Sequence, residues 1–145
     1  MTETVVVVSG YFNPLHVGHV RMMRAAKQLG DLLVVVVNND RQQILKKGRI
    51  IINERDRAEV VESVGVVDRV ISSVDDGPSV RATLAKIRQE YPGHRIIFAN
   101  GGDRRDADSI AEAATCKDLD IEIEFGVGGG DKADASSRII AELGV

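Results

Sequence analysis

The chain has 145 residues, of which 43% are hydrophobic and 28% are charged, as is typical of one soluble globular domain with its own core. Its net charge of −3 argues against electrostatic binding to nucleic acid or to an anionic membrane. No apolar run approaches the roughly 20 residues of a membrane span. The single cysteine, Cys116, excludes an internal disulfide and fits a reducing compartment. We therefore expect one cytoplasmic domain over residues 1–145, or one domain of a larger protein.

Apolar and helical segments alternate along the chain. Runs rich in β-branched residues predict strands over residues 4–8, 32–37, 69–74, 95–99 and 121–125. Helical spacing predicts helices over residues 17–29, 54–64, 78–91, 107–119 and 136–143. The strands are almost continuously apolar, as expected for a sheet covered on both faces. This alternation predicts an α/β fold that is Rossmann-like and doubly wound, with a five-stranded parallel sheet and helices on both faces.

Polar residues follow four of the predicted strands, where a doubly wound fold binds its ligand. They are Asn13, His16 and His19 after the first strand, Asn38, Asn39 and Asp40 after the second, Asn100 to Asp103 after the fourth, and the loop 126–137 after the fifth. Because the carboxyl ends of parallel strands share one edge of the sheet, these residues are expected to converge there.

His16 and His19 carry the clearest chemical signal. They lie three residues apart, with Gly18 between them, where a strand leads into a helix. A helix start offers unpaired backbone N–H groups and a positive dipole end, which together bind anions. Pro14 stiffens the turn, and Gly18 lets backbone approach a ligand. The pattern predicts phosphate chemistry. A pair of surface histidines and a metal pair are the alternatives, but zinc HExxH sites use a four-residue spacing and a glutamate.

The pattern from Gly10 to Asn38 resembles the cytidylyltransferase-like nucleotidyltransferases, whose signature is HxGH. It is most similar to the small cytidylyltransferases that act on glycerol 3-phosphate, phosphoethanolamine or phosphocholine, and to the nucleotidyltransferase domain of heptose-phosphate enzymes. The similarity extends to Arg57, to Val67-Asp68, to a GGD turn at Gly101-Gly102-Asp103 and to a closing motif at Ala135-Ser136-Ser137-Arg138-Ile139. The motifs GxxxxGK[ST] and GxGxxG of other phosphate-binding turns do not occur at the first turn, which argues against a kinase or a dehydrogenase.

The resemblance implies roles for individual residues. His16, His19 and Lys46 would be catalytic, and Lys46, Lys47 and Arg57 would bind the substrate phosphate. The nucleotide would contact Gly10, Tyr11, Phe12, Asn13, Gly18, Gly101, Gly102, Asp103, Ser136 and Ser137. The closing motif departs from the family, because Gly130 stands where members often carry an arginine and Ala135 replaces the first serine. Either Lys46 or Lys47 could act, and Arg57 could instead pair with acidic neighbours on a helix surface.

The resemblance implies nucleotidyl transfer from CTP to a small phosphate or phosphonate, with release of pyrophosphate. An adenylyltransferase that uses ATP and a catalytically silent nucleotide-binding module are the alternatives. Mg²⁺ would be held mostly by phosphate oxygens and water, and no residue of the chain is expected to be a metal ligand. The histidines would donate hydrogen bonds to the phosphates, with a pKa near 6.5 that gives them partial positive charge. A homodimer is expected from the resemblance alone.

Overall fold

The computed structural model, which describes residues 3–99, 107–124 and 127, contains one five-stranded sheet in that part of the chain. Its strands are β1 (Thr4–Gly10), β2 (Leu32–Val37), β3 (Arg69–Ser72), β4 (Arg95–Ala99) and β5 (Glu122–Glu124). They lie in the order β3-β2-β1-β4-β5, and every neighbouring pair is parallel. All carboxyl ends therefore lie at one edge, called the carboxyl edge below. The strand order reverses between β1 and β4, where doubly wound folds bind ligands.

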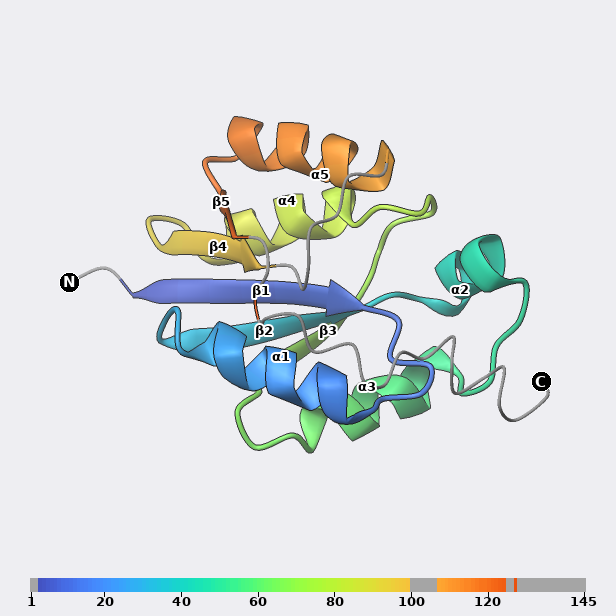
Figure 1. The fold of residues 1–145 in the computed structure, drawn as a ribbon. Helices are drawn as coiled ribbons and strands as arrows, with labels where there is room; N and C mark the ends of the chain where they lie inside the picture. Colours follow the sequence, from blue (N-terminus) through green and yellow to red (C-terminus); the bar gives the residue numbers. More distant parts are fainter. Residues whose placement is uncertain (1–2, 100–106, 125–126, 128–145) are drawn as a thin grey trace.

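Helices cover both faces of this sheet, which confirms the predicted fold class. The described helices are α1 (Val17–Lys27), α2 (Asp40–Lys47), α3 (Glu54–Glu62), α4 (Arg81–Glu90) and α5 (Ala107–Asp118). In Figure 1, α1 and α3 lie below the sheet, α4 and α5 lie above it, and α2 stands beyond the carboxyl edge.

Alternate residues of the strands feed two separate cores. Val5 and Val7 of β1 belong to a cluster with Leu84 of α4 and Cys116 of α5. On the other face, Val6 and Val8 belong to a cluster with Met23 of α1 and Val61 of α3. All four valines are fully buried, which explains why the strand is apolar without alternation. Burial, with a smaller effect of Glu112, raises the pKa of Cys116 to about 12, so this thiol has a packing role.

The Val67-Asp68 pair lies at the opposite edge from the carboxyl ends. The Asp68 carboxylate accepts hydrogen bonds from the Leu33 backbone N–H and from the Lys27 ammonium group. It thereby joins the end of α1 to the start of β2. This part of the family pattern is therefore structural in this chain.

The structure differs from the sequence prediction chiefly at α2. This helix lies between the predicted strand 32–37 and the predicted helix 54–64, where no element was predicted, and Lys46 and Lys47 are its last two residues. β1 continues two residues beyond its predicted end at Val8, and β3 ends at Ser72, two residues before its predicted end. The predicted helix over residues 136–143 lies outside the described residues.

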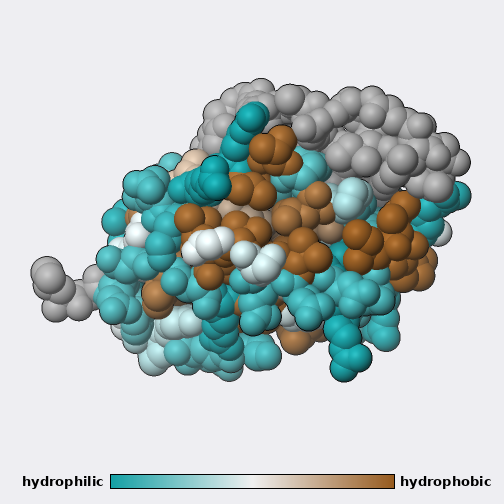
Figure 2. Space-filling view, turned by 90° about the horizontal axis from the view of Figure 1, so that it is seen from below, coloured by the Kyte–Doolittle hydropathy of each residue, from teal (hydrophilic) through white to brown (hydrophobic). Residues whose placement is uncertain are grey.

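Exposed apolar side chains gather near the carboxyl edge. Ile44 and Leu45 of α2 are 53% and 61% exposed, and Ile50 and Ile51 of the following loop are each 38% exposed. Figure 2 shows apolar side chains in the middle of the lower face and at the end of the molecule that holds α2. None of the described helices has the length and apolar character needed to cross a membrane.

Candidate phosphate-binding site at the start of helix α1

The turn after β1 has an unusual backbone, which carries it from the strand into α1. Phe12 has a φ of 51°, and the Asn13–Pro14 peptide bond is cis. The Phe12 ring folds back over Gly10, where a Cβ atom would lie only 2.7 Å from the ring. Glycine is therefore required at position 10 by this close approach. The Phe12 ring is 2% exposed and meets the His19 ring edge-on, with centroids 4.9 Å apart. Its side chain supports His19 from within the core instead of lining a cavity.

His16 and His19 together cap the start of α1. His16 is the N-cap residue, and its Nδ1 accepts a hydrogen bond from the Gly18 backbone N–H at 3.1 Å. Nδ1 of His19 accepts one from the His16 backbone N–H at 3.2 Å. This is a capping box in which two imidazoles replace the usual serine and glutamate. The Gly18 N–H is thus used by the cap, whereas the sequence predicted Gly18 as a position where backbone contacts the nucleotide.

The capping box determines which ring nitrogen of His16 and of His19 carries the proton. An Nδ1 atom that accepts a hydrogen bond carries no proton, so the neutral ring must carry its proton on Nε2. The two rings stack with centroids 3.7 Å apart and an angle of 25° between their planes. Each ring has its Nδ1 at the helix start and therefore carries its N–H donor on Nε2. Such a pair suits a ligand with several closely spaced oxygen atoms.

His19 is neutral near pH 7 in this structure. Burial, together with the neighbouring His16, lowers the pKa of His19 to about 4. Protonation would also place a hydrogen on Nδ1 and break the bond to the His16 N–H. The expected partial positive charge is therefore wrong for His19, which acts as a neutral donor. The positive potential at this site comes instead from the dipole of α1, since the Gly18, His19 and Val20 N–H groups all donate to His16.

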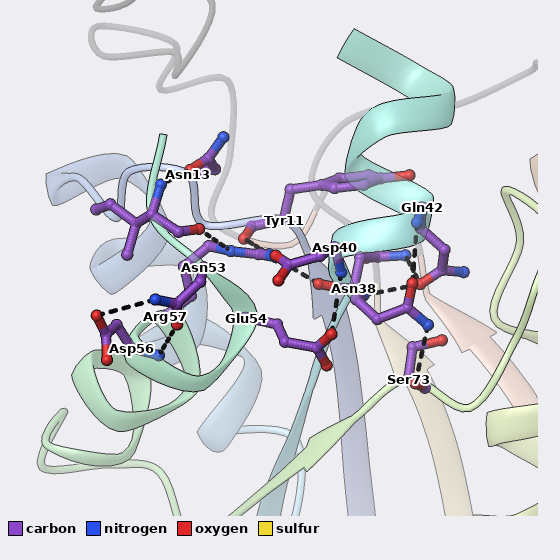
Figure 3. A network of polar contacts seen from close by, with 12 residues as sticks. Tyr11, Asn13, Asn38, Asp40, Gln42, Asn53, Glu54, Asp56, Arg57 and Ser73 are labelled. Carbon is purple, nitrogen blue, oxygen red and sulfur yellow. Dashed lines mark hydrogen bonds and ion pairs between the residues drawn. The ribbon is translucent and has the colours of Figure 1, made fainter. Parts of the chain in front are cut away.

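Arg57 occupies a different place from the one the sequence suggested. Its side chain is 0% exposed and donates four hydrogen bonds of 2.7 Å each. The acceptors are the backbone carbonyls of Tyr11, Asn38 and Ile52 and the Asp40 carboxylate. Figure 3 shows the guanidinium group between the ends of β1 and β2 and the start of α2. Burial of this kind disfavours the predicted contact of Arg57 with a substrate phosphate, and it also excludes an exposed position on the surface of α3.

Asn13 is connected to this network through Ile52. The side-chain oxygen of Asn13 accepts a hydrogen bond from the Ile52 N–H at 2.8 Å. Asn13 is 2% exposed, and its Nδ2 has no hydrogen-bond partner in the described part of the chain. In Figure 3 this nitrogen points away from the guanidinium group of Arg57. Asn13 is thus an oriented amide donor in the turn that leads to His16.

The polar residues after β2 form a second capping box. The Asn39 oxygen accepts from the Gln42 N–H at 2.9 Å, and the Gln42 oxygen accepts from the Asn39 N–H at 3.0 Å. Their amide nitrogens donate to carbonyl groups of the loop after β3, at Ser73, Asp75, Gly77 and Ser79. This box starts α2 and fixes the neighbouring loop. The predicted polar residues after β1 and β2 therefore share one edge, but those after β2 are structural.

Lys46 lies beside the turn after β1. It is an exposed residue of α2, and its Nζ is 5.1 Å from the centroid of the Tyr11 ring. The structure thus brings a cation close to the residues that lead into the capping box. The side chain of Lys47 lies outside the described part of the chain. Gly101, Gly102, Asp103, Ser136 and Ser137 also lie outside the described residues.

The described residues contain no group of three or more His, Cys, Asp or Glu side chains that could hold a metal ion. In this part of the chain, the donor groups suit an anion and do not form a metal cage.

The chain is similar to known proteins over most of its length. Residues 7–124 match the family model described as cytidylyltransferase-like. The chain is 35% identical to an FAD synthase from Thermococcus sibiricus over 120 residues, which are 81% of this chain and 76% of the relative. It is 48% identical to an FAD synthase from Pyrococcus abyssi over 67 residues, which are 46% of this chain and 45% of that protein.

A second group of relatives is much longer. The chain is 42% identical over 103 residues to the bifunctional protein HldE of Koribacter versatilis, which covers 70% of this chain but only 20% of that protein. Among solved structures, a lipopolysaccharide core biosynthesis protein from Thermoplasma volcanium superposes with a TM-score of 0.66 at 27% identity, covering 85% of this chain and 93% of that one. A protein of unknown function from Archaeoglobus fulgidus shares the fold, with a TM-score of 0.59 at 17% identity.

Proposed function

This chain belongs to the cytidylyltransferase-like family of nucleotidyltransferases, and we propose that the start of α1 binds the triphosphate of its nucleotide substrate. The observation that carries this proposal is the capping box of His16 and His19, which leaves both rings as Nε2–H donors at a helix N-terminus. Neutral N–H donors at the positive end of a helix dipole suit a polyanionic phosphate.

The proposed reaction needs positioning more than acid–base chemistry. A phosphate oxygen of the acceptor attacks the α-phosphorus of the nucleotide and forms a new P–O bond. The bond from the α-phosphorus to the oxygen that bridges to the β-phosphate breaks, and its electron pair leaves with pyrophosphate. The attacking oxygen is already anionic near neutral pH, so no strong base is required. The Nε2–H groups of His16 and His19 stabilise the negative charge that grows on the phosphates, and Lys46 reduces repulsion between the two anions.

The relatives favour ATP as the nucleotide. An FAD synthase produces a dinucleotide that contains adenosine, and two of the relatives described above carry this name. Adenylyl transfer is therefore proposed as the first candidate. Cytidylyl transfer from CTP, which the sequence pattern favoured, remains the second candidate because the family model is named for it.

The surface near α2 favours an acceptor with an apolar part. Ile44, Leu45, Ile50 and Ile51 expose apolar surface near Lys46, at the same edge of the sheet as the histidines. An acceptor that combines a phosphate with a flat apolar ring, as flavin mononucleotide does, would use both the cation and this surface. A sugar phosphate or a small phosphonate would use only the cation.

Three other features stay predictions. Mg²⁺ would lower the charge of the triphosphate when bound, and the proposed roles of His16, His19 and Lys46 do not depend on how it is held. A homodimer and a cytoplasmic location are expected from the resemblance and the composition, and light scattering would measure the former.

A pyrophosphate-release assay tests the proposal directly. ATP and CTP are each paired, in the presence of Mg²⁺, with flavin mononucleotide, a heptose phosphate, glycerol 3-phosphate and a phosphonate. We expect release with ATP and a phosphorylated acceptor, and a nucleotide-linked product by mass spectrometry. Release with CTP alone would replace the first candidate by the second. If the protein binds ATP or CTP but no pair releases pyrophosphate, the catalytically silent module is the correct interpretation.

A further inference from the structure

Arg57 is placed where it can set the geometry of the candidate site without touching a ligand. We propose that Arg57 is a positioning residue for the nucleotidyl transfer proposed above, and that it acts on the start of α1 through the turn after β1. The kinetic consequences rest on that proposed function. The hydrogen bonds themselves do not, and they can be tested separately.

The guanidinium group joins three backbone segments that are far apart in sequence. It binds the carbonyls of Tyr11 after β1, Asn38 after β2 and Ile52 before α3, and it pairs with Asp40 at the first position of α2. Four of its five N–H groups are therefore used within the chain. A buried cation is costly unless it is paired and fully hydrogen bonded, so this cation stabilises one arrangement of these segments.

The network reaches the turn before the capping box in two steps. Arg57 Nε donates to the Ile52 carbonyl, and the N–H of the same residue donates to the Asn13 side-chain oxygen. The bond from the Ile52 N–H fixes the orientation of the Asn13 amide through its oxygen. Asn13 lies three residues before His16, and Tyr11, whose carbonyl Arg57 also binds, precedes it in the same turn. Loss of the guanidinium group should therefore disturb the turn that places His16 and His19.

Substitution of Arg57 separates positioning from substrate contact. Arg57→Gln should lower kcat by about 30- to 100-fold, because small displacements of catalytic groups have effects of this size. The KM for the acceptor should change by less than about threefold. Arg57→Lys should not restore kcat, because an ammonium group lacks the planar donors that bind several carbonyls at once. Arg55→Gln is the matched control, since Arg55 is exposed on the same helix, and it should leave both constants unchanged.

A substrate contact would give the opposite pattern. If Arg57 bound the acceptor phosphate, the KM for the acceptor would rise in Arg57→Gln, and Arg57→Lys would recover much of the loss through its charge. Either result would overturn the inference.

Amide hydrogen exchange tests the same network without any enzyme assay. The Gly18 N–H donates to His16, and the Ile52 N–H donates to Asn13. In Arg57→Gln both amides should lose about tenfold in protection, whereas amides inside β2 should keep theirs. Equal loss throughout the sheet would show a role in global stability only, and no loss at Gly18 and Ile52 would refute positioning.

Asp40→Asn provides a milder version of the experiment if Arg57→Gln does not fold. It removes the negative partner, whose side chain is 29% exposed, and leaves the three bonds from Arg57 to backbone carbonyls. The same two amides should lose protection to a smaller extent, and unchanged protection would count against the inference. A protein that shows these exchange changes but releases no pyrophosphate would refute the proposed function and leave the network intact.

Discussion

Helices α1 and α2 both start at the carboxyl edge with a capping box, but they use different residues for it. The box of α2 consists of Asn39 and Gln42, whose remaining donors bind carbonyl groups of the loop after β3. The box of α1 consists of His16 and His19, whose remaining donors are the Nε2–H groups. The cap is therefore the same local structure in both helices. Each side chain caps its helix through an acceptor atom, and the partner of its N–H donor decides whether the side chain stabilises a loop or serves a ligand.

The largest expected effect on kcat comes from replacing the capping-box residues of α1 by those of α2. The double variant His16→Asn/His19→Gln gives α1 the residues that cap α2, so α1 should keep its cap and the thermal midpoint should change little. Because both Nε2–H donors are lost, kcat should fall by about 100-fold or more. Steady-state pyrophosphate release together with calorimetry measures both quantities. A variant with a normal kcat would show that the histidines serve only as a cap.

The capping box of α1 should make protein stability depend on pH through His19, whereas the Asn39 and Gln42 side chains of the α2 box do not titrate. The pKa of His19 is about 4 in the folded protein, below the value of 6.5 for a free imidazole, so the unfolded chain binds more protons between these pH values. Stability should therefore be complete above pH 6.5 and should fall as the pH drops towards 4, with a slope of up to about 1.4 kcal/mol per pH unit.

Urea unfolding of the wild type and of His19→Gln between pH 4.5 and 7.5 measures this contribution. The difference between the two proteins removes the effects of other titrating groups. A constant difference across this range would mean that His19 has an ordinary pKa, contrary to the capping geometry.

The box of α2 should contribute to stability without contributing to catalysis. Asn39→Ala removes a cap and the two bonds to the Ser73 and Asp75 carbonyls, and should cost about 2–3 kcal/mol. Asn53→Ala is the control, because Asn53 caps α3 through the Asp56 N–H and is exposed, and it should cost about 1 kcal/mol. Denaturant unfolding measures both. Equal losses would show that the bonds to the loop after β3 contribute nothing, and a large loss of kcat in folded Asn39→Ala would contradict the division of roles.

The smallest expected effect is that of the Lys46 charge, near the capping box of α1, on the KM for the acceptor. Lys46→Gln should raise the KM for the acceptor by about three- to tenfold, and added salt should weaken this effect because Lys46 is exposed. Arg41→Gln on the same helix removes a cation that pairs with Asp76 on the surface, and it should have no effect on KM. Equal effects of the two variants would point to the general field of α2 and not to a contact by Lys46.

Much of this fold could be predicted from the sequence, because buried parallel strands and amphipathic helices have strong patterns. The parallel sheet and the meeting of residues after β1 and β2 at one edge follow from those patterns, whereas the strand order was not predicted. Helix α2 was missed because Asp40–Lys47 is short and mostly polar. A local signal was nevertheless present, since Asn39 is followed three residues later by Gln42, as in a capping box.

The candidate site was only partly predictable. A strand that leads to HxGH indicates a phosphate site, but it does not show that His16 and His19 cap the helix through Nδ1 and carry their protons on Nε2. The resemblance implied that Arg57 binds the substrate phosphate, and its charged neighbours in sequence left an exposed position on a helix surface as the alternative. Its burial depends on carbonyl groups of Tyr11, Asn38 and Ile52, which only the tertiary structure brings together.

The most direct test is nitrogen-15 NMR of the histidine rings during titration with a non-hydrolysable ATP analogue and Mg²⁺. Near pH 7, the free protein should show both His16 and His19 as neutral rings with the proton on Nε2, and the saturated protein should show both Nε2–H signals shifted by a new hydrogen bond. Rings protonated on Nδ1 in the free protein, or two Nε2–H signals that do not move when the nucleotide is bound, would contradict the account.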